Sequence, residues 1–147
     1  MASPRVGSVV AGAPVPVHHR DGRVHSWFVP VTVDTWLAGF FQFLADGTLM
    51  RYSSFQRRPD SLANCPEADT WTDPEAIRRQ ARIGAHAGET ALAPFLTFED
   101  EPTRLAWAVP LAIDGKVVRT VMVAGRSVWE ARAPDEDVDA YGGSSSA

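Results

Sequence analysis

Cysteine is almost absent from this sequence, which has Cys65 as its single thiol among 147 residues. One cysteine forms no intramolecular disulfide, and it excludes a structural zinc site built on several cysteines. A chain of this length buries roughly two thirds of the surface that its unfolded form exposes, so it can fold without such cross-links. We therefore expect one domain over residues 1–132, stabilised by its apolar core.

Long apolar runs and a strong net charge are missing as well. No segment approaches the roughly 20 apolar residues of a membrane-spanning helix, and residues 1–15 lack the apolar run of a secretory signal. The formal charge of −4 provides no attraction to nucleic acid. We expect no membrane span, no nucleic-acid partner and, by default, a cytoplasmic protein. Residues 133–147, acidic and then rich in Gly and Ser, predict a disordered tail.

Motifs for catalysis or metal binding are also lacking. There is no Gly-x-Ser-x-Gly turn and no phosphate-binding loop. His18 and His19 fall on opposite faces of a strand, so at most two of His18, His19 and His25 can reach one metal ion. Asp34 and Asp114 occupy matching positions, but each fits a residue that opens a turn. We therefore predict no catalytic residue, no metal ion and no cofactor.

The most informative feature that is present is an internal repeat. Residues 27–43 read WFVPVTVDTWLAGFFQF and residues 107–123 read WAVPLAIDGKVVRTVMV, so Trp, Val, Pro and Asp recur after 80 positions. The same offset gives seven identities between positions 11–34 and their counterparts. Alternating apolar residues between Asp-Gly turns predict strands joined by hairpins. We predict two antiparallel β-meanders, over residues 14–55 and 91–132.

One good helix is predicted between the meanders, within residues 56–90. Either Thr72 and Glu75 form a capping box, or Asp73 caps the helix with Pro74 in its first position. The apolar stripe of this helix is thin, so it should cover a sheet. The helix should run to about Ala87 and stop near Gly84 or Gly88. The predicted fold class is α+β, with duplicated antiparallel β-meanders and one main helix between them.

Two strand features constrain the packing of the first meander. Pro30 lacks the N–H of a ladder hydrogen bond, which places its strand at a sheet edge or beside a bulge. The strand predicted over residues 36–44 is apolar on both faces. We therefore expect both faces of that strand to be covered.

The two copies differ on one strand face. The first copy has aromatic residues where the second has small or polar ones, namely Phe28, Trp36 and Phe40 against Ala108, Lys116 and Thr120. The aromatic residues either pack beneath the helix or the other meander, or they line a pocket, a partner surface or a dimer interface. We predict the binding site here, from Phe28, Trp36 and Phe40 with the neighbouring Arg51 and Tyr52.

The second half resembles the PepSY and propeptide-type modules, in which a helix packs on an antiparallel sheet in a cystatin-like arrangement. The resemblance rests on the helix, Pro94-Phe-Leu-Thr-Phe, Arg104-Leu-Ala-Trp-Ala-Val, Asp114-Gly and a last pair of apolar strands. It covers about residues 74–131, with residues 14–55 as a degenerate second copy. The resemblance implies a non-catalytic intramolecular chaperone, protease inhibitor or ligand-binding accessory.

Three functions are compatible with these patterns. The favoured one is a non-catalytic binding or accessory module that presents its aromatic face to a protein, a peptide or an apolar small molecule. An alternative is a small cavity-type enzyme, similar to a cyclase or isomerase, in which Arg51, Tyr52, His25 or Asp34 provides polar groups around a hydrophobic substrate. The third is a structural homodimer that uses the strand of residues 36–44.

Overall fold

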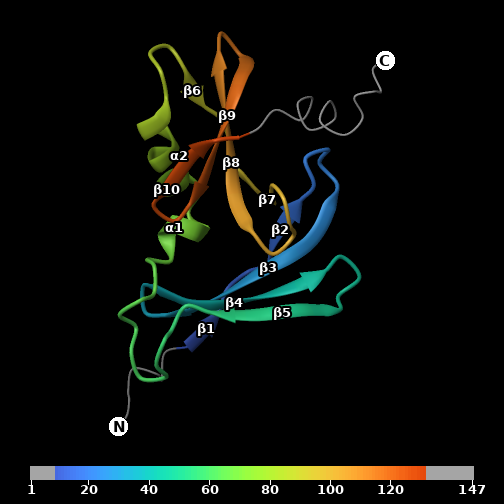
Figure 1. The fold of residues 1–147 in the computed structure, drawn as a ribbon, viewed down its shortest axis with the longest axis vertical. Coiled ribbons are helices and arrows are strands. Elements are labelled where there is room, and N and C mark those ends of the chain that lie inside the picture. The colour runs from blue at the N-terminus through green and yellow to red at the C-terminus, as the bar shows by residue number, and fades with distance from the viewer. Residues whose placement is uncertain (1–8, 132–147) are drawn as a thin grey trace.

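The computed structural model describes residues 9–131, an α+β structure whose strands in this range form one sheet. The strand order is β10-β9-β8-β7-β2-β3-β4-β5, with β1 paired to β3 and β6 paired to β8. The bounds are β1 Val9–Ala11, β2 Val15–His18, β3 Val24–Val33, β4 Trp36–Leu44, β5 Leu49–Ser54, β6 Thr90–Ala91, β7 Phe95–Phe98, β8 Leu105–Ile113, β9 Lys116–Ala124 and β10 Ser127–Glu130. In Figure 1 the first half-sheet, β1–β5, lies below the second, β6–β10.

The long hairpin of each half turns in the same way. Asp34 between β3 and β4 has a φ of 56°, and Asp114 between β8 and β9 has a φ of 52°. Asp is one of the few residues that adopt this left-handed conformation readily, which explains its presence at both turns. The register also shifts once in each hairpin, between Val31 and Thr32 and between Leu111 and Ala112. Pro30 therefore lies beside a bulge in an interior strand.

The two halves meet at the parallel pair β2 and β7, where Val17 lies opposite Leu96. Paired residues share a face of the sheet, and neighbours along a strand alternate between faces. Val17 and Leu96 therefore lie on the same face. The residue that matches Val17 after the offset of 80 is Thr97, the neighbour of Leu96, which lies on the other face. Matching positions in the two halves therefore point to opposite faces of the sheet. We call the face that carries Phe28 in the first half and Trp107 in the second the inner face.

The inner face and the helices enclose the main core. The helical segments are α1 Asp69–Thr72, α2 Pro74–Ala81 and the 3-10 turn η2 Arg82–Gly84. The buried core residues are Val17, Phe28, Leu37, Phe40, Ile77, Ala81, Ala91, Leu96, Trp107, Val109, Leu111, Val121 and Val123. They come from both half-sheets and from α2, so the helix joins the two halves into one apolar cluster.

Helix α2 begins with the second of the two predicted caps, in which Asp73 caps the helix and Pro74 follows it. The Asp73 side chain accepts a hydrogen bond from the Glu75 N–H at 3.0 Å, and Pro74 occupies the first turn of α2. The α-helix itself ends at Ala81, before the predicted Ala87, and the 3-10 turn η2 ends at Gly84, which is one of the two predicted stops. The short helix α1 was not predicted. The chain then continues to β6, which pairs with β8.

Two predictions concern membrane spans and the C-terminal tail. Within residues 9–131, no helix is both long and apolar enough to cross a membrane. The tail predicted over residues 133–147 lies outside the described residues.

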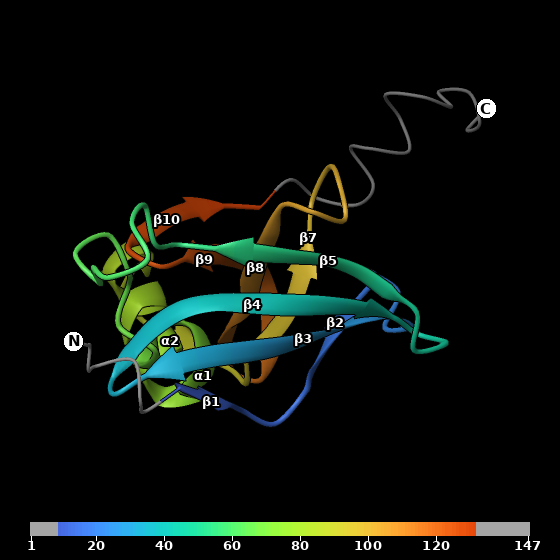
Figure 2. The ribbon, with the colours of Figure 1, turned by 90° about the horizontal axis from the view of Figure 1, so that it is seen from below.

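The described residues cover only one face of strand β4. Leu37 and Phe40 lie in the main core, whereas Phe41 and Phe43 point to the opposite side and are half-buried. Figure 2 looks onto this opposite side, with β3 and β4 in front of the helices. The prediction that both faces are covered is therefore not met by residues 9–131, because their helical layer lies on the inner face.

A paired arginine and glutamate fasten β9 to the segment between η2 and β6. Arg119 donates to both carboxylate oxygens of Glu89, from Nε at 3.0 Å and from Nη2 at 2.9 Å, and the Glu89 side chain is 4 % exposed. The hydrogen bonds from Arg119, and then that from the His86 N–H, lower the pKa of Glu89 from 4.5 to about 2. The folded protein thus favours the ionised form of the Glu89 carboxylate.

Glu89→Gln is expected to reduce the acid sensitivity of the fold. A carboxylate with a lowered folded-state pKa stabilises the protein above its unfolded pKa, and that contribution disappears as the pH falls from about 4.5 to about 2. Urea unfolding across this pH range should therefore show a shallower loss of stability in Glu89→Gln than in the wild type. Glu75→Gln is the control, because Glu75 forms exposed ion pairs; equal acid profiles for the wild type and Glu89→Gln would contradict the prediction.

Candidate functional site

The structure places two of the predicted site residues in the core. Phe28 is 1 % exposed and Phe40 is 7 % exposed. Their ring centroids lie 4.8 Å apart, and Phe28 also stacks on Trp71 of α1 at 6.2 Å. Phe28 and Phe40 therefore pack in the core and do not present an exposed aromatic face to a partner.

The remaining predicted residues lie in three different places. Trp36 is 38 % exposed at the start of β4, and Tyr52 is 48 % exposed on the outer side of β5, where its ring lies 4.8 Å from that of Phe41. Arg51 points to the inner side, with its guanidinium 4.9 Å from the ring centroid of Phe40. Burial lowers the pKa of the Arg51 guanidinium. The structure thus brings Arg51 and Phe40 together and separates Tyr52 from both.

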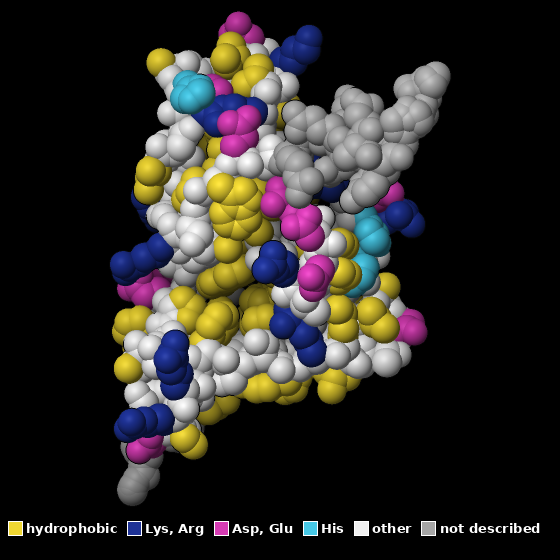
Figure 3. Space-filling model, in the orientation of Figure 1, with side chains coloured by type: hydrophobic (Ala, Val, Ile, Leu, Met, Phe, Trp, Pro, Cys, Tyr) yellow, Lys and Arg dark blue, Asp and Glu magenta, His cyan; other side chains and the backbone are white. Residues whose placement is uncertain are grey.

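A groove crosses the molecule between the end of β5, helix α1 and the strands of the second half. It consists of two hollows of about 500 and 260 Å³. The two hollows share Phe55 and Trp71 as lining residues. Figure 3 shows the apolar side chains gathered in a hollow across the middle of this face, with charged side chains at its rim. We call the two hollows that share Phe55 and Trp71 the central groove.

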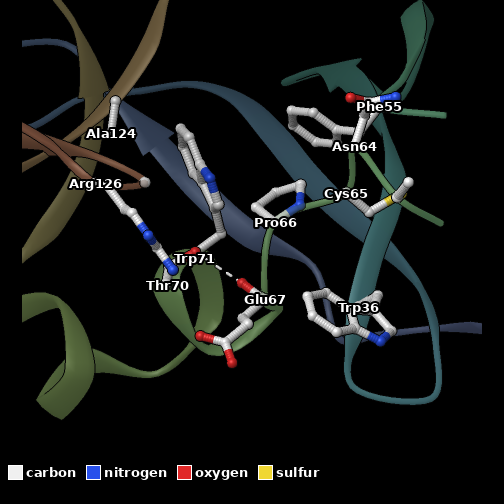
Figure 4. Close-up of a pocket in the computed structure, with 12 residues that line it drawn as sticks. Trp36, Phe55, Asn64, Cys65, Pro66, Glu67, Thr70, Trp71, Ala124 and Arg126 are labelled. Atoms are coloured by element: carbon white, nitrogen blue, oxygen red, sulfur yellow. Dashed lines mark hydrogen bonds between the residues drawn. The ribbon is translucent and has the colours of Figure 1, made fainter. Parts of the chain in front are cut away.

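The larger hollow is built by the segment that precedes α1. The Leu37 N–H donates to the Pro66 carbonyl at 2.8 Å, and the Ala68 N–H donates to the Thr35 carbonyl at 2.8 Å. These bonds fix the segment beside β4 and set the position of Trp71. In Figure 4 the Trp71 ring lies between the Ala124–Arg126 turn and Pro66.

The lining of this hollow is mainly apolar, with few charged groups. Its lining residues are Trp36, Phe55, Ala63, Asn64, Cys65, Pro66, Glu67, Thr70, Trp71, Ala124, Gly125 and Arg126. Arg126 and Glu67 are both exposed, so their charges lie at the solvent side of the hollow. An apolar floor with a few charged rim groups is typical of a binding site for a side chain or a small ligand.

A buried polar chain closes the other end of the groove. Gln42, fully buried in β4, donates from Nε2 to Ser26 Oγ at 3.0 Å and to the Pro102 carbonyl at 3.2 Å. Its Oε1 accepts from Arg51 Nε at 2.9 Å, and Arg51 Nη2 donates to the Thr103 carbonyl at 2.7 Å. These bonds tie the segment between β7 and β8 to the first half-sheet, which keeps Arg51 at the groove wall.

The polar residues proposed for a cavity enzyme do not converge. Asp34 lies in the exposed β3–β4 turn, and Tyr52 lies on the outer side of the sheet. His25 contacts Ser26 Oγ through Nδ1 at 2.9 Å and packs against Phe98, and its pKa is lowered by burial and then by the charge of His19. The geometry therefore leaves Arg51 alone among these four residues in the central groove.

Neither a reactive thiol nor a metal site stands out in the described residues. Cys65 is buried at the groove wall, and burial raises the pKa of its thiol, which keeps it protonated and weakly nucleophilic. Residues 9–131 contain no cluster of three or more His, Cys, Asp or Glu side chains that could hold a metal ion.

Sequence reasoning missed most residues of the central groove, including two aromatic residues and two arginines. Phe55 follows β5, Trp71 lies in α1, Arg104 precedes β8 and Arg126 lies in the β9–β10 turn. They are far apart in the chain and share no motif. The one available signal was Trp71, an aromatic residue immediately before the predicted helix start at Thr72.

Comparison with known proteins gives no relative from which a role can be transferred. No protein-family model, curated protein or solved structure matches the chain at a significant level. The resemblance of residues 74–131 to PepSY and propeptide-type modules therefore stays a prediction.

Proposed function

We propose that this protein is a non-catalytic binding module whose central groove receives an extended peptide segment of a partner protein. The observation that carries the proposal is the position of an aromatic-lined groove beside the strand β5. Phe40, Phe55, Trp71 and Leu105 provide an apolar floor for one large side chain of the peptide. This replaces the exposed aromatic face predicted from the sequence with a groove whose deeper aromatic residues hold its shape.

The edge of β5 supports an extended ligand. Among the described strands, β5 pairs with β4 only, so its other edge has no strand partner in residues 9–131. An added strand gains backbone hydrogen bonds there, while alternate side chains enter the neighbouring hollows. Ser53 of β5 and Phe55 just beyond it line the hollow next to this edge. A peptide in the β conformation thus fits the groove better than a compact ligand does.

The charges around the groove support a polar peptide backbone as ligand. Arg104 and Arg126 are exposed at the two hollows, and within residues 9–131 neither forms an ion pair. Guanidinium groups donate hydrogen bonds to carbonyl and carboxylate oxygens. Each arginine can therefore hold a peptide carbonyl or an acidic side chain that flanks the buried one.

We also propose that the two half-sheets are copies of one β unit. The strand pairs β1 and β6, β2 and β7, β3 and β8, β4 and β9, and β5 and β10 occupy corresponding places in the strand order. Gly12 and Leu92, which are 80 positions apart, donate their N–H groups to the equivalent carbonyls of Pro30 and Pro110 at 2.8 and 2.9 Å. These parallels support a duplication of one β unit, in which the first copy provides the β5 edge beside the groove.

Phe55→Ala is expected to weaken peptide binding about tenfold or more, because it removes the aromatic wall shared by two hollows. The probe is a fluorescently labelled, capped heptapeptide of threonine with a central phenylalanine, and binding is measured by anisotropy. A second peptide has proline on both sides of the phenylalanine, so that it keeps the aromatic ring but lacks two backbone donors. The proline peptide should bind more weakly to the wild type.

Phe95→Ala is the matched control, because Phe95 is also half-buried but packs in the separate cluster around Ala106, Ala108 and Met122. This variant should bind the phenylalanine peptide as the wild type does. Equal affinity of both peptides would show that the groove takes an apolar side chain without strand pairing. Equal affinity of Phe55→Ala and the wild type would contradict the proposed groove.

A further inference from the structure

The outer face of the first half-sheet is apolar, and no described element covers it. Its residues lie opposite one another across β3, β4 and β5, namely Trp27, Val29, Val31, Phe41, Phe43 and Tyr52. None of them is charged, and the Phe41 ring packs against both Tyr52 at 4.8 Å and Phe43 at 6.1 Å. Figure 2 looks onto this side of the sheet, with the helices behind it. We call this surface the outer face.

The corresponding face of the second half is covered. The counterparts of five of these residues after the offset of 80 are Trp107, Val109, Leu111, Val121 and Val123, all of which lie in the main core. Ile77 and Ala81 of α2 belong to the same core. The same apolar pattern is therefore present in both halves. Within residues 9–131, helix α2 and the main core cover it in the second half, and no element covers it in the first. An uncovered apolar face of this size is typical of an interaction site.

We propose that the outer face is the interface of a homodimer, in which the outer faces of two copies pack against each other. The ten residues of β3 span about 33 Å at 3.3 Å per residue. The face is four strands wide, because β1 and β2 share one side of β3, which gives about 19 Å at 4.8 Å per strand. A footprint of about 600 Å² per copy gives about 1,200 Å² in total, at the lower end of stable interfaces.

The packing of Tyr52 over Gly39 favours a second copy as the occupant of the outer face. At Gly39 an added Cβ would lie 2.5 Å from Tyr52 Oη, so the tyrosine lies across the glycine and leaves no ridge there. A single helix is about 10 Å wide and would cover about half of the face, whereas an identical sheet covers all of it. A two-fold axis also pairs two neutral surfaces, so no charge is left buried without a partner.

Tyr52→Arg and Val29→Arg are expected to convert the dimer to a monomer. Sedimentation equilibrium from low to high micromolar protein should give twice the chain mass of 16.0 kDa for the wild type and 16.0 kDa for both variants. The dissociation constant should rise at least about a hundredfold, because each dimer would bury two like charges. Val117→Arg is the control, since Val117 is exposed on β9 of the second half, and it should remain dimeric.

Near-ultraviolet circular dichroism separates lost association from lost folding. If Val29→Arg unfolds, Tyr52→Arg decides, because Tyr52 is exposed in the monomer and its substitution leaves the core intact. A wild type that stays monomeric at the highest concentration overturns the proposal, as does a dimer that Tyr52→Arg leaves intact. A dimer that Val117→Arg dissociates overturns it too. The peptide groove opens on the inner side, so Tyr52→Arg should still bind the phenylalanine peptide.

Discussion

Trp107→Ala is expected to lower the free energy of unfolding by about 3–5 kcal/mol, the usual cost of truncating a buried aromatic residue. Trp107 lies in the main core, and its Nε1 donates to the Trp71 carbonyl at 3.1 Å. The substitution therefore leaves a cavity and also removes the bond that anchors α1. Because small domains have only about 5–15 kcal/mol of stability in total, urea denaturation should show a clear shift of the midpoint.

Trp27→Ala is the matched control for this prediction. Trp27 is the counterpart of Trp107 in the first half, but it lies on the outer face and is half-buried. Measured at a protein concentration where the chain is monomeric, its loss should cost only about 1 kcal/mol, near the average for a point substitution. Equal losses for the two variants would contradict the inversion of faces between the half-sheets.

Most of the strands could be predicted because their signals are local. The alternation in residues 24–33 and the turn at Asp114-Gly115 each lie within a few neighbours, and the strands observed there agree with them. Which face is buried could not be predicted, since that depends on the parallel pairing of Val17 with Leu96 across the chain. The buried face of each half-sheet therefore depends on the pairing of β2 with β7, which no local sequence pattern encodes.

The candidate site was harder to predict for the same reason. Phe28 was chosen because its counterpart Ala108 is small, but these two residues face opposite sides of the sheet and do not report on function. The central groove is lined by Phe55, Trp71 and Arg104, which come from three segments that are far apart in the chain. Arg51 is the one predicted polar residue that lies in it, and its hydrogen bond to Gln42 was not readable from the sequence.

Gln42→Leu is expected to lower the free energy of unfolding by about 2–4 kcal/mol, because unpaired buried polar groups cost about 1–3 kcal/mol each. The orientation of the Gln42 amide is fixed by its partners, since Arg51 only donates and the Pro102 carbonyl only accepts. Leucine satisfies neither partner. The segment between β7 and β8 should therefore loosen, which hydrogen–deuterium exchange would detect as faster exchange of the Arg104 N–H.

Gln56→Leu provides the same chemical change at an accessible site. Gln56 donates from Nε2 to the Pro59 and Ser61 carbonyls at 3.2 and 3.3 Å, in a loop where water can replace these bonds. This variant should lose no more than about 0.5 kcal/mol, as is usual for surface substitutions. Arg51 would keep its bond to the Thr103 carbonyl in Gln42→Leu but would lose the acceptor that aligns its Nε. Similar losses in the two variants would show that Gln42 does not anchor the end of the groove.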